Sequence, residues 1–148
     1  MVPTLSGRIQ TRLFLLICIG IPWTLIITPL APHHRGASIG HLYETTFWVL
    51  AEVIVVGCLF WEPLYHGLMQ FRWEKDWPIM FLLLEGIPEG LTAYGLLHAI
   101  GPHPSPPAAT TSTFVVDFVV LWVLVWLAAI GPMRVLFHRW RFRGGQIL

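Results

Sequence analysis

Five acidic side chains fall inside long apolar stretches of the sequence, and these side chains have the clearest capacity for chemistry. They are Glu52, Glu62, Glu85, Glu89 and Asp117. An ionisable group within a bilayer costs roughly 2.5–3.5 kcal/mol on insertion scales, so it is kept for a structural or functional reason. We therefore consider Glu52, Glu85, Glu89 and Asp117 as candidate proton or ion sites, or as contacts between subunits.

Glu85 and Glu89 are the most informative pair, because residues four apart share one face of a helix. Pro88 lies between them and cannot donate a backbone hydrogen bond to Leu84, which leaves a carbonyl oxygen beside two carboxyls. Interrupted helices with exposed carbonyls form cation or proton sites in many transporters. Two close carboxyls do not both ionise in a dry environment, so we expect this pair to hold a proton.

The same segment supports a structural interpretation. Gly86 and Gly90 stand on either side of Pro88 and form a GxxxG pattern, which allows a close approach between membrane helices. They also make the helix easy to kink. On this interpretation Glu85 and Glu89 are neutral and are hydrogen-bonded to neighbouring side chains. Both interpretations remain open from the sequence.

The histidines do not complete a metal or cofactor site. Glu62 and His66 share a helix face, but a metal site needs three or four ligands, so we predict a hydrogen-bonded pair and no metal. Haem is the cofactor that helical bundles with facing histidines can bind. Here His41 could meet His98, and His66 could meet His138, only at the membrane boundaries. We therefore predict no cofactor and rank haem as an unfavoured alternative.

The elements that position these residues follow from composition. Hydrophobic residues make up 55% of the 148-residue chain and charged residues 11%, whereas a soluble domain carries about 25% charge. Four apolar runs are close to the ~20 residues that span a bilayer. They cover residues 13–31, 46–65, 77–100 and 113–137. We predict an all-α polytopic membrane protein, a single membrane domain over residues 1–148, with four transmembrane helices in an up-down-up-down bundle.

The basic residues predict the orientation. Eight of them precede the first run, lie between the second and third, or lie at or beyond the end of the fourth: Arg8, Arg12, Arg72, Lys75, Arg134, Arg139, Arg141 and Arg143. Only Arg35 falls on the other side. Because Lys and Arg are enriched in cytoplasmic loops, we expect both termini to be cytoplasmic. This orientation predicts a multi-pass protein of the plasma membrane, in the bacterial inner membrane.

Two polar segments follow the second and fourth runs. Between the second and third runs, Phe71, Arg72 and Trp73 combine aromatic rings with a guanidinium group, which are common in interface hot spots. We consider this segment a possible partner contact. The basic, aromatic tail of residues 137–148 is explained by contact with anionic lipid headgroups.

Three functions remain after these exclusions. The first is a non-catalytic membrane subunit or accessory protein of a larger membrane complex, because several intramembrane acids need neighbours. The alternative is a small proton- or cation-coupled transporter, either with other membrane chains or as a homo-oligomer. The third is a membrane enzyme acting on a lipid, with Glu85 or Glu89 as the acid near His98. A net charge of +1 gives no reason to expect a nucleic acid partner.

Overall fold

The computed structural model describes residues 4–31, 38–73, 78–102, 110–140 and 142–147. Within these ranges all regular secondary structure is helical and no strand occurs. Four helical stretches are long and apolar enough to cross a membrane: Leu5–Leu30, Ile39–Gln70, Met80–Ile100 and Thr111–Leu136. The predictions of an all-α chain and of four such helices are therefore confirmed.

Each stretch consists of two or three helical elements. The first contains α1 (Leu5–Leu15), the π-helical segment η1 (Leu16–Gly20) and α2 (Ile21–Leu30). The second contains α3 (Ile39–Val56), the π-helical segment η2 (Gly57–Trp61) and α4 (Glu62–Gln70). The third contains α5 (Ile79–Leu84) and α6 (Gly86–Ile100), and the fourth contains α7 (Thr111–Ile130) and α8 (Pro132–Leu136).

The first two helices begin well before the apolar runs that start at residues 13 and 46, because polar side chains cap them. The side-chain oxygen of Thr4 accepts a hydrogen bond from the backbone N–H of Gly7 at 3.1 Å. In the same way Ser38 accepts from the backbone N–H of His41 at 3.3 Å, and Thr110 accepts from that of Thr113 at 3.2 Å. Each cap satisfies a backbone donor that the first turn of a helix leaves unpaired. Arg8 and Arg12 are thereby included in the first helix.

Each of the first three helical stretches is interrupted shortly before a proline. The segment η1 ends two residues before Pro22, and η2 ends two residues before Pro63. The third stretch is interrupted at Glu85, three residues before Pro88. Proline has no N–H to donate to the preceding turn, so the backbone there widens or breaks. These positions change the direction in which the following side chains project.

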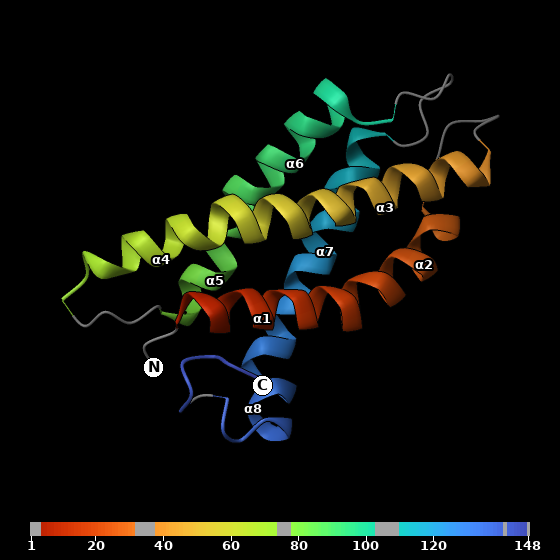
Figure 1. The fold of residues 1–148 in the computed structure, drawn as a ribbon. Helices are drawn as coiled ribbons and strands as arrows, with labels where there is room; N and C mark the ends of the chain where they lie inside the picture. The colour runs from red at the N-terminus through yellow and green to blue at the C-terminus, as the bar shows by residue number, and fades with distance from the viewer. Residues whose placement is uncertain (1–3, 32–37, 74–77, 103–109, 141, 148) are drawn as a thin grey trace.

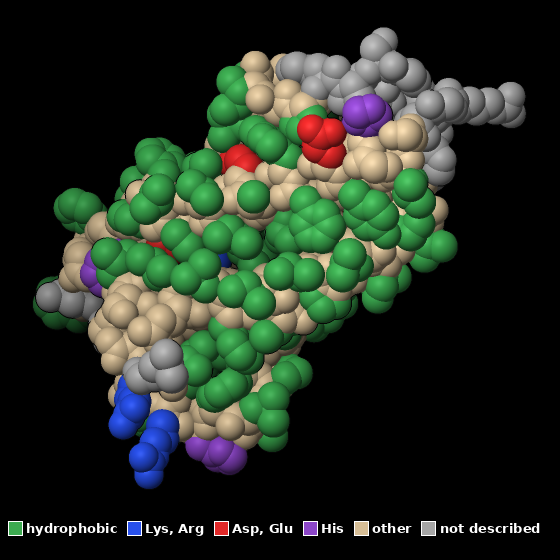
Figure 2. Space-filling model, turned by 45° about the vertical axis from the view of Figure 1, so that its right-hand side comes forward, with side chains coloured by type: hydrophobic (Ala, Val, Ile, Leu, Met, Phe, Trp, Pro, Cys, Tyr) green, Lys and Arg blue, Asp and Glu red, His purple; other side chains and the backbone are tan. Residues whose placement is uncertain are grey.

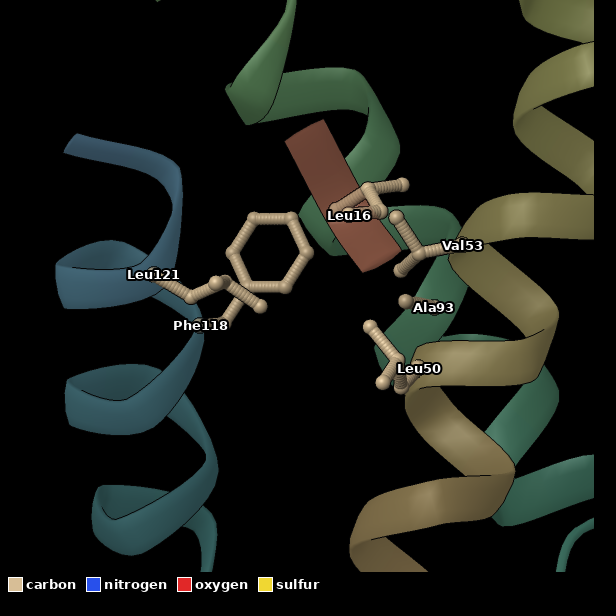
Figure 3. Packing of buried hydrophobic residues seen from close by; sticks show 6 residues of the cluster. All are labelled: Leu16, Leu50, Val53, Ala93, Phe118 and Leu121. Carbon is tan, nitrogen blue, oxygen red and sulfur yellow. The ribbon is translucent and has the colours of Figure 1, made fainter. Parts of the chain in front are cut away.

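Among the described residues, the larger of two buried apolar clusters brings together side chains of all four helical stretches. The α1–α2 and α3–α4 stretches lie side by side, and the α5–α6 and α7–α8 stretches cross them (Figure 1). Side chains from all four stretches converge where they cross (Figure 3): Leu16, Leu50, Val53, Ala93, Phe118 and Leu121. We call these six residues the central apolar cluster.

The outer surface is largely apolar. Figure 2 shows hydrophobic side chains over most of one face, with Lys and Arg gathered at its lower edge. Exposed residues such as Ile26, Leu91 and Val116 project from three different helices. A surface of this kind exceeds the apolar patches of soluble monomers and is suited to contact with lipid chains.

The chain that follows α8 packs against α1. The backbone N–H of Thr4 donates to the carbonyl oxygen of Gly144 at 2.8 Å, and Trp140 Nε1 donates to Thr11 Oγ1 at 2.8 Å. At Gly7, an added Cβ would lie 2.1 Å from the Gly144 oxygen, so only glycine permits this approach. The sequence attributed this tail to lipid headgroups alone, but the structure gives it a protein contact as well.

Candidate functional site

Two arginines and three glutamates form a buried chain of ion pairs in the order Glu85–Arg8–Glu62–Arg12–Glu89. Arg8 Nη2 donates to Glu85 Oε1 at 3.0 Å, and Arg8 Nε donates to Glu62 Oε2 at 2.5 Å. Arg12 Nε donates to Glu62 Oε1 at 2.7 Å, while its two Nη atoms donate to Glu89 at 2.5 and 2.6 Å. All five residues are buried. We call them the charge ladder.

Three membrane helices position the ladder. Arg8 and Arg12 are four residues apart on α1 and therefore project from one face. Glu62 is the first residue of α4, directly after the π-helical segment η2. Glu85 and Glu89 lie at the break between α5 and α6 and one turn beyond it. The ladder therefore links the first, second and third helical stretches of the chain.

Aromatic rings and a glycine enclose the two guanidinium groups. The guanidinium carbon of Arg8 lies 5.7 Å from the centroid of the Tyr65 ring, and that of Arg12 lies 5.8 Å from a Trp122 ring. A cation over an aromatic face is stabilised by the ring quadrupole. On another side, a Cβ added to Gly57 would lie 2.4 Å from Arg12 Nη1. The absence of a side chain at Gly57 thus makes room for Arg12.

The carbonyl groups around the Glu85 break are bound by protein donors. Trp122 Nε1 lies 3.2 Å from the carbonyl oxygens of both Leu82 and Leu83. The Tyr65 hydroxyl donates to the carbonyl oxygen of Glu85 at 3.4 Å. The sequence suggested that this break presents free carbonyls to a cation. These three carbonyls accept hydrogen bonds from side chains, but the Leu84 carbonyl, to which Pro88 cannot donate, is not one of them.

The two glycines beside Pro88 pack against aromatic side chains of α7. A Cβ added to Gly86 would lie 2.4 Å from the Trp122 ring, and one added to Gly90 would lie 2.7 Å from the Phe118 ring. The GxxxG pattern therefore accommodates two large rings rather than the backbone of another helix. This packing sets the position of α6, which carries Glu89.

Glu52 and Asp117 lie outside the ladder. Glu52 is buried, and its Oε2 atom has no hydrogen-bond partner. Asp117 is half-buried, and its Oδ1 atom accepts a hydrogen bond from Trp23 Nε1 at 2.6 Å. Within the described residues no salt bridge joins either acid to a basic side chain, and no hydrogen bond joins the two acids.

The predicted hydrogen bond between Glu62 and His66 is wrong. Both carboxylate oxygens of Glu62 accept from the two arginines, and the buried Nδ1 atom of His66 has no hydrogen-bond partner. The sequence prediction failed because Arg8 and Arg12, which compete for Glu62, come from another helix. Among the described residues, no group of three His, Cys, Asp or Glu side chains is placed to hold a metal ion.

The structure also separates His98 from the ladder. His98 Nδ1 donates to the carbonyl oxygen of Tyr94 at 2.9 Å, near the far end of α6. Glu89 and His98 are nine positions apart in sequence, which corresponds to about 13 Å along a helix. Glu89 meanwhile accepts both of its hydrogen bonds from Arg12. The geometry therefore places His98 apart from Glu89, the acid with which the sequence suggested a joint site.

The segment after α4 exposes its aromatic side chains. Phe71 is 89% exposed and Trp73 is 100% exposed. The guanidinium carbon of Arg72 lies 5.5 Å from the centroid of the Phe81 ring, so this side chain folds back onto α5. Two exposed rings thus flank an arginine that is held by the third helical stretch.

Sequence analysis missed the role of Arg8 and Arg12. It placed both before the first membrane helix, as bases in a flanking segment, although they are inside the helix and form ion pairs with three acids. Two signals pointed to this role: the four-residue spacing, which aligns the arginines on one face, and the need of buried acids for counter-charges.

No protein-family model, curated protein or solved structure matches this chain. The function is therefore argued from the residues of the site.

Proposed function

We propose that this protein is a small proton- or cation-coupled transporter, with the charge ladder as its coupling site. The observation that carries the proposal is the charge count of the ladder. Three carboxylates and two guanidinium groups have a formal charge of 2 − 3 = −1 when all are ionised. A net charge is costly in a buried, low-dielectric site, so uptake of one proton or one monovalent cation neutralises the ladder favourably.

Glu52 supports the proposal by providing a second acceptor near the ladder. It lies on α3, which packs against the α6 helix that carries Glu89. Its buried Oε2 atom has no hydrogen-bond partner and can therefore take a proton or contact a cation without breaking an existing bond. The Glu52 carboxyl can therefore act as the acceptor of the proton that leaves the ladder.

We place the ladder near the cytoplasmic face of an up-down-up-down bundle, with both termini cytoplasmic and the chain in the plasma membrane of a bacterium. Arg8 and Arg12 are buried counter-charges, so they no longer count as loop bases. The remaining six are still opposed only by Arg35: Arg72, Lys75, Arg134, Arg139, Arg141 and Arg143. The excess of Lys and Arg that predicts the orientation therefore remains when Arg8 and Arg12 are left out of the count.

The substitution Glu89→Gln tests the proposal. It removes the surplus carboxyl and leaves two carboxylates with two guanidinium groups, a formal charge of zero. The glutamine oxygen can still accept a hydrogen bond from Arg12, so we expect the fold to be kept. We expect proton uptake into proteoliposomes, followed with a trapped pH-sensitive dye, to fall at least tenfold.

Glu44→Gln is the matched control, because Glu44 is exposed and contacts only His41, at 3.2 Å, among the ion pairs described. This variant is expected to retain the wild-type flux. Size-exclusion profiles establish that both variants are folded. Wild-type flux in folded Glu89→Gln protein would contradict the assignment of the ladder as the coupling site.

A second function, an accessory subunit of a membrane complex, is supported by a different observation. The three ladder acids no longer require a partner protein as a source of counter-charge, since each is paired with Arg8 or Arg12 of the same chain. The rings of Phe71 and Trp73 support a partner protein instead. They are largely exposed on both sides of Arg72, and aromatic and arginine side chains are enriched among the residues that dominate binding at protein interfaces.

Purification from native membranes in mild detergent tests this second function. If the chain is a subunit, other membrane chains co-elute with it, and the double substitution Phe71→Ala and Trp73→Ala releases them. Phe142→Ala is the matched control, since this ring in the tail is 88% exposed and should not affect the complex. A homogeneous particle that contains only this chain would exclude the subunit function.

A further inference from the structure

A small cavity lies beyond the central apolar cluster, away from the charge ladder. Its volume is about 40 Å³, and side chains of α2, α3, α6 and α7 line it. Four members of the cluster form part of its wall: Leu50, Val53, Phe118 and Leu121 (Figure 3). No ladder residue lines it. The apolar cluster thus lies between this cavity and the ladder.

Among the residues that the structure describes, Asp117 is the only acid that lines the cavity, and it has no basic partner. Trp23 Nε1 holds its Oδ1 atom at 2.6 Å, which fixes the carboxyl group. The ladder glutamates are paired with arginines, but among the described residues no salt bridge reaches Asp117. A carboxylate in this position is favourable when a cation occupies the cavity beside it.

The other lining groups define which cation fits. Thr45 Oγ1 uses its hydrogen to donate to the carbonyl oxygen of His41 at 2.8 Å, so its lone pairs can still accept. The rings of Phe114 and Phe118 contribute aromatic surface. Most of the wall is apolar, whereas an alkali ion needs a ring of oxygens to replace its hydration shell. Ammonium and methylammonium need only a few acceptors and also bind to aromatic faces.

The volume restricts the cation further. A cavity needs a volume of roughly 10–15 Å³ to hold one water molecule, and a cavity of about 150 Å³ can hold benzene. The cavity of about 40 Å³ therefore takes an ion of a few heavy atoms at most. We propose, on the basis of the proposed transport function, that this cavity binds ammonium or a small primary amine cation at Asp117, and that this ion is the transported substrate.

The cavity and the charge ladder then have different roles. The cavity binds the amine cation, the ladder binds the proton, and the central apolar cluster prevents ions from passing freely between them (Figure 3). A coupled carrier needs such a barrier, because an open polar path would dissipate both gradients. Ion movement then requires the helices to rearrange around the cluster.

Calorimetric titration of the purified protein in detergent tests the cavity site without requiring transport. We expect saturable binding of methylammonium chloride and no saturable binding of tetramethylammonium, which exceeds the cavity, or of sodium. We expect Asp117→Asn to weaken methylammonium binding at least tenfold. Glu44→Gln, which removes an exposed acid on α3, should leave the affinity unchanged.

Thr45→Val keeps the test decisive if Asp117→Asn fails to fold, because valine preserves the shape of the side chain and removes the acceptor. We expect it to weaken binding at least threefold. Saturable sodium binding, equal affinity in Asp117→Asn, or no saturable binding of methylammonium would each overturn the cavity proposal. None of these results would affect the Glu89→Gln flux test, so failure at the cavity is distinguishable from failure of the ladder.

Discussion

Replacing Arg12 with methionine is expected to destabilise the protein by about 3–5 kcal/mol, the cost of leaving buried charges without a partner. Arg12 donates to Glu62 once and to Glu89 twice. Its loss leaves one guanidinium group against three carboxylates, a formal charge of 1 − 3 = −2 in a buried site. Thermal unfolding in detergent, followed by circular dichroism, measures the effect as a large fall in the midpoint temperature.

The double substitution Arg12→Met with Glu89→Leu is the control for this result. It removes an ion pair and restores the formal charge of the ladder to 1 − 2 = −1, the native value. Replacing both members of a buried pair with apolar side chains is often neutral or stabilising. We therefore expect the double variant to recover most of the lost stability. A double variant no more stable than Arg12→Met would show that unpaired charge does not explain the loss.

The number and type of helices could be predicted because they depend on local properties. An apolar run of about 20 residues must form its own backbone hydrogen bonds in a bilayer, whatever it packs against. The caps at Thr4 and Ser38 lengthen the first two helices beyond those runs. Hydropathy could not locate these helix starts, because the added turns carry polar and charged side chains.

The acids could be identified as candidate site residues, but their partners could not. A glutamate in an apolar run is conspicuous in any sequence. Arg8 and Arg12 were not conspicuous, because bases before an apolar run normally mark a flanking loop. Which acid each base meets depends on the turn of η2 before Glu62 and on the break at Glu85, and neither follows from helical periodicity.

Gly57 illustrates a requirement that sequence reasoning cannot detect. Nothing near it in the chain needs a glycine, and it lies at the first position of a π-helical segment within an apolar stretch. The requirement comes from Arg12, which is distant in sequence and crosses the helix at this point. A glycine that makes room for a neighbouring helix's side chain becomes visible only in the folded structure.

Gly57→Ala is accordingly expected to destabilise the protein by about 1–3 kcal/mol, the usual cost of overpacking. The added Cβ would lie 2.4 Å from Arg12 Nη1 and 3.0 Å from Arg12 Cζ. A free arginine could move its end aside, but this one cannot do so without leaving Glu62 and Glu89. Gly67→Ala on α4 is the matched control, because nothing lies within 4 Å of its added Cβ. Alanine favours helix by up to about 1 kcal/mol over glycine, so Gly67→Ala should be neutral or stabilising.

A double-mutant cycle tests whether Arg12 is the cause. In an Arg12→Met background the guanidinium group is gone, and methionine can adapt its flexible side chain to the new methyl group. The cost of Gly57→Ala should then fall to less than half of its value in the wild-type background, which is a coupling free energy of the size seen for residues in direct contact. An equal cost in both backgrounds would place the clash elsewhere and would separate Gly57 from the ladder. A coupling would show instead that the widened turn at Gly57 and the charge ladder form one unit, in which helix geometry and ion pairing depend on each other.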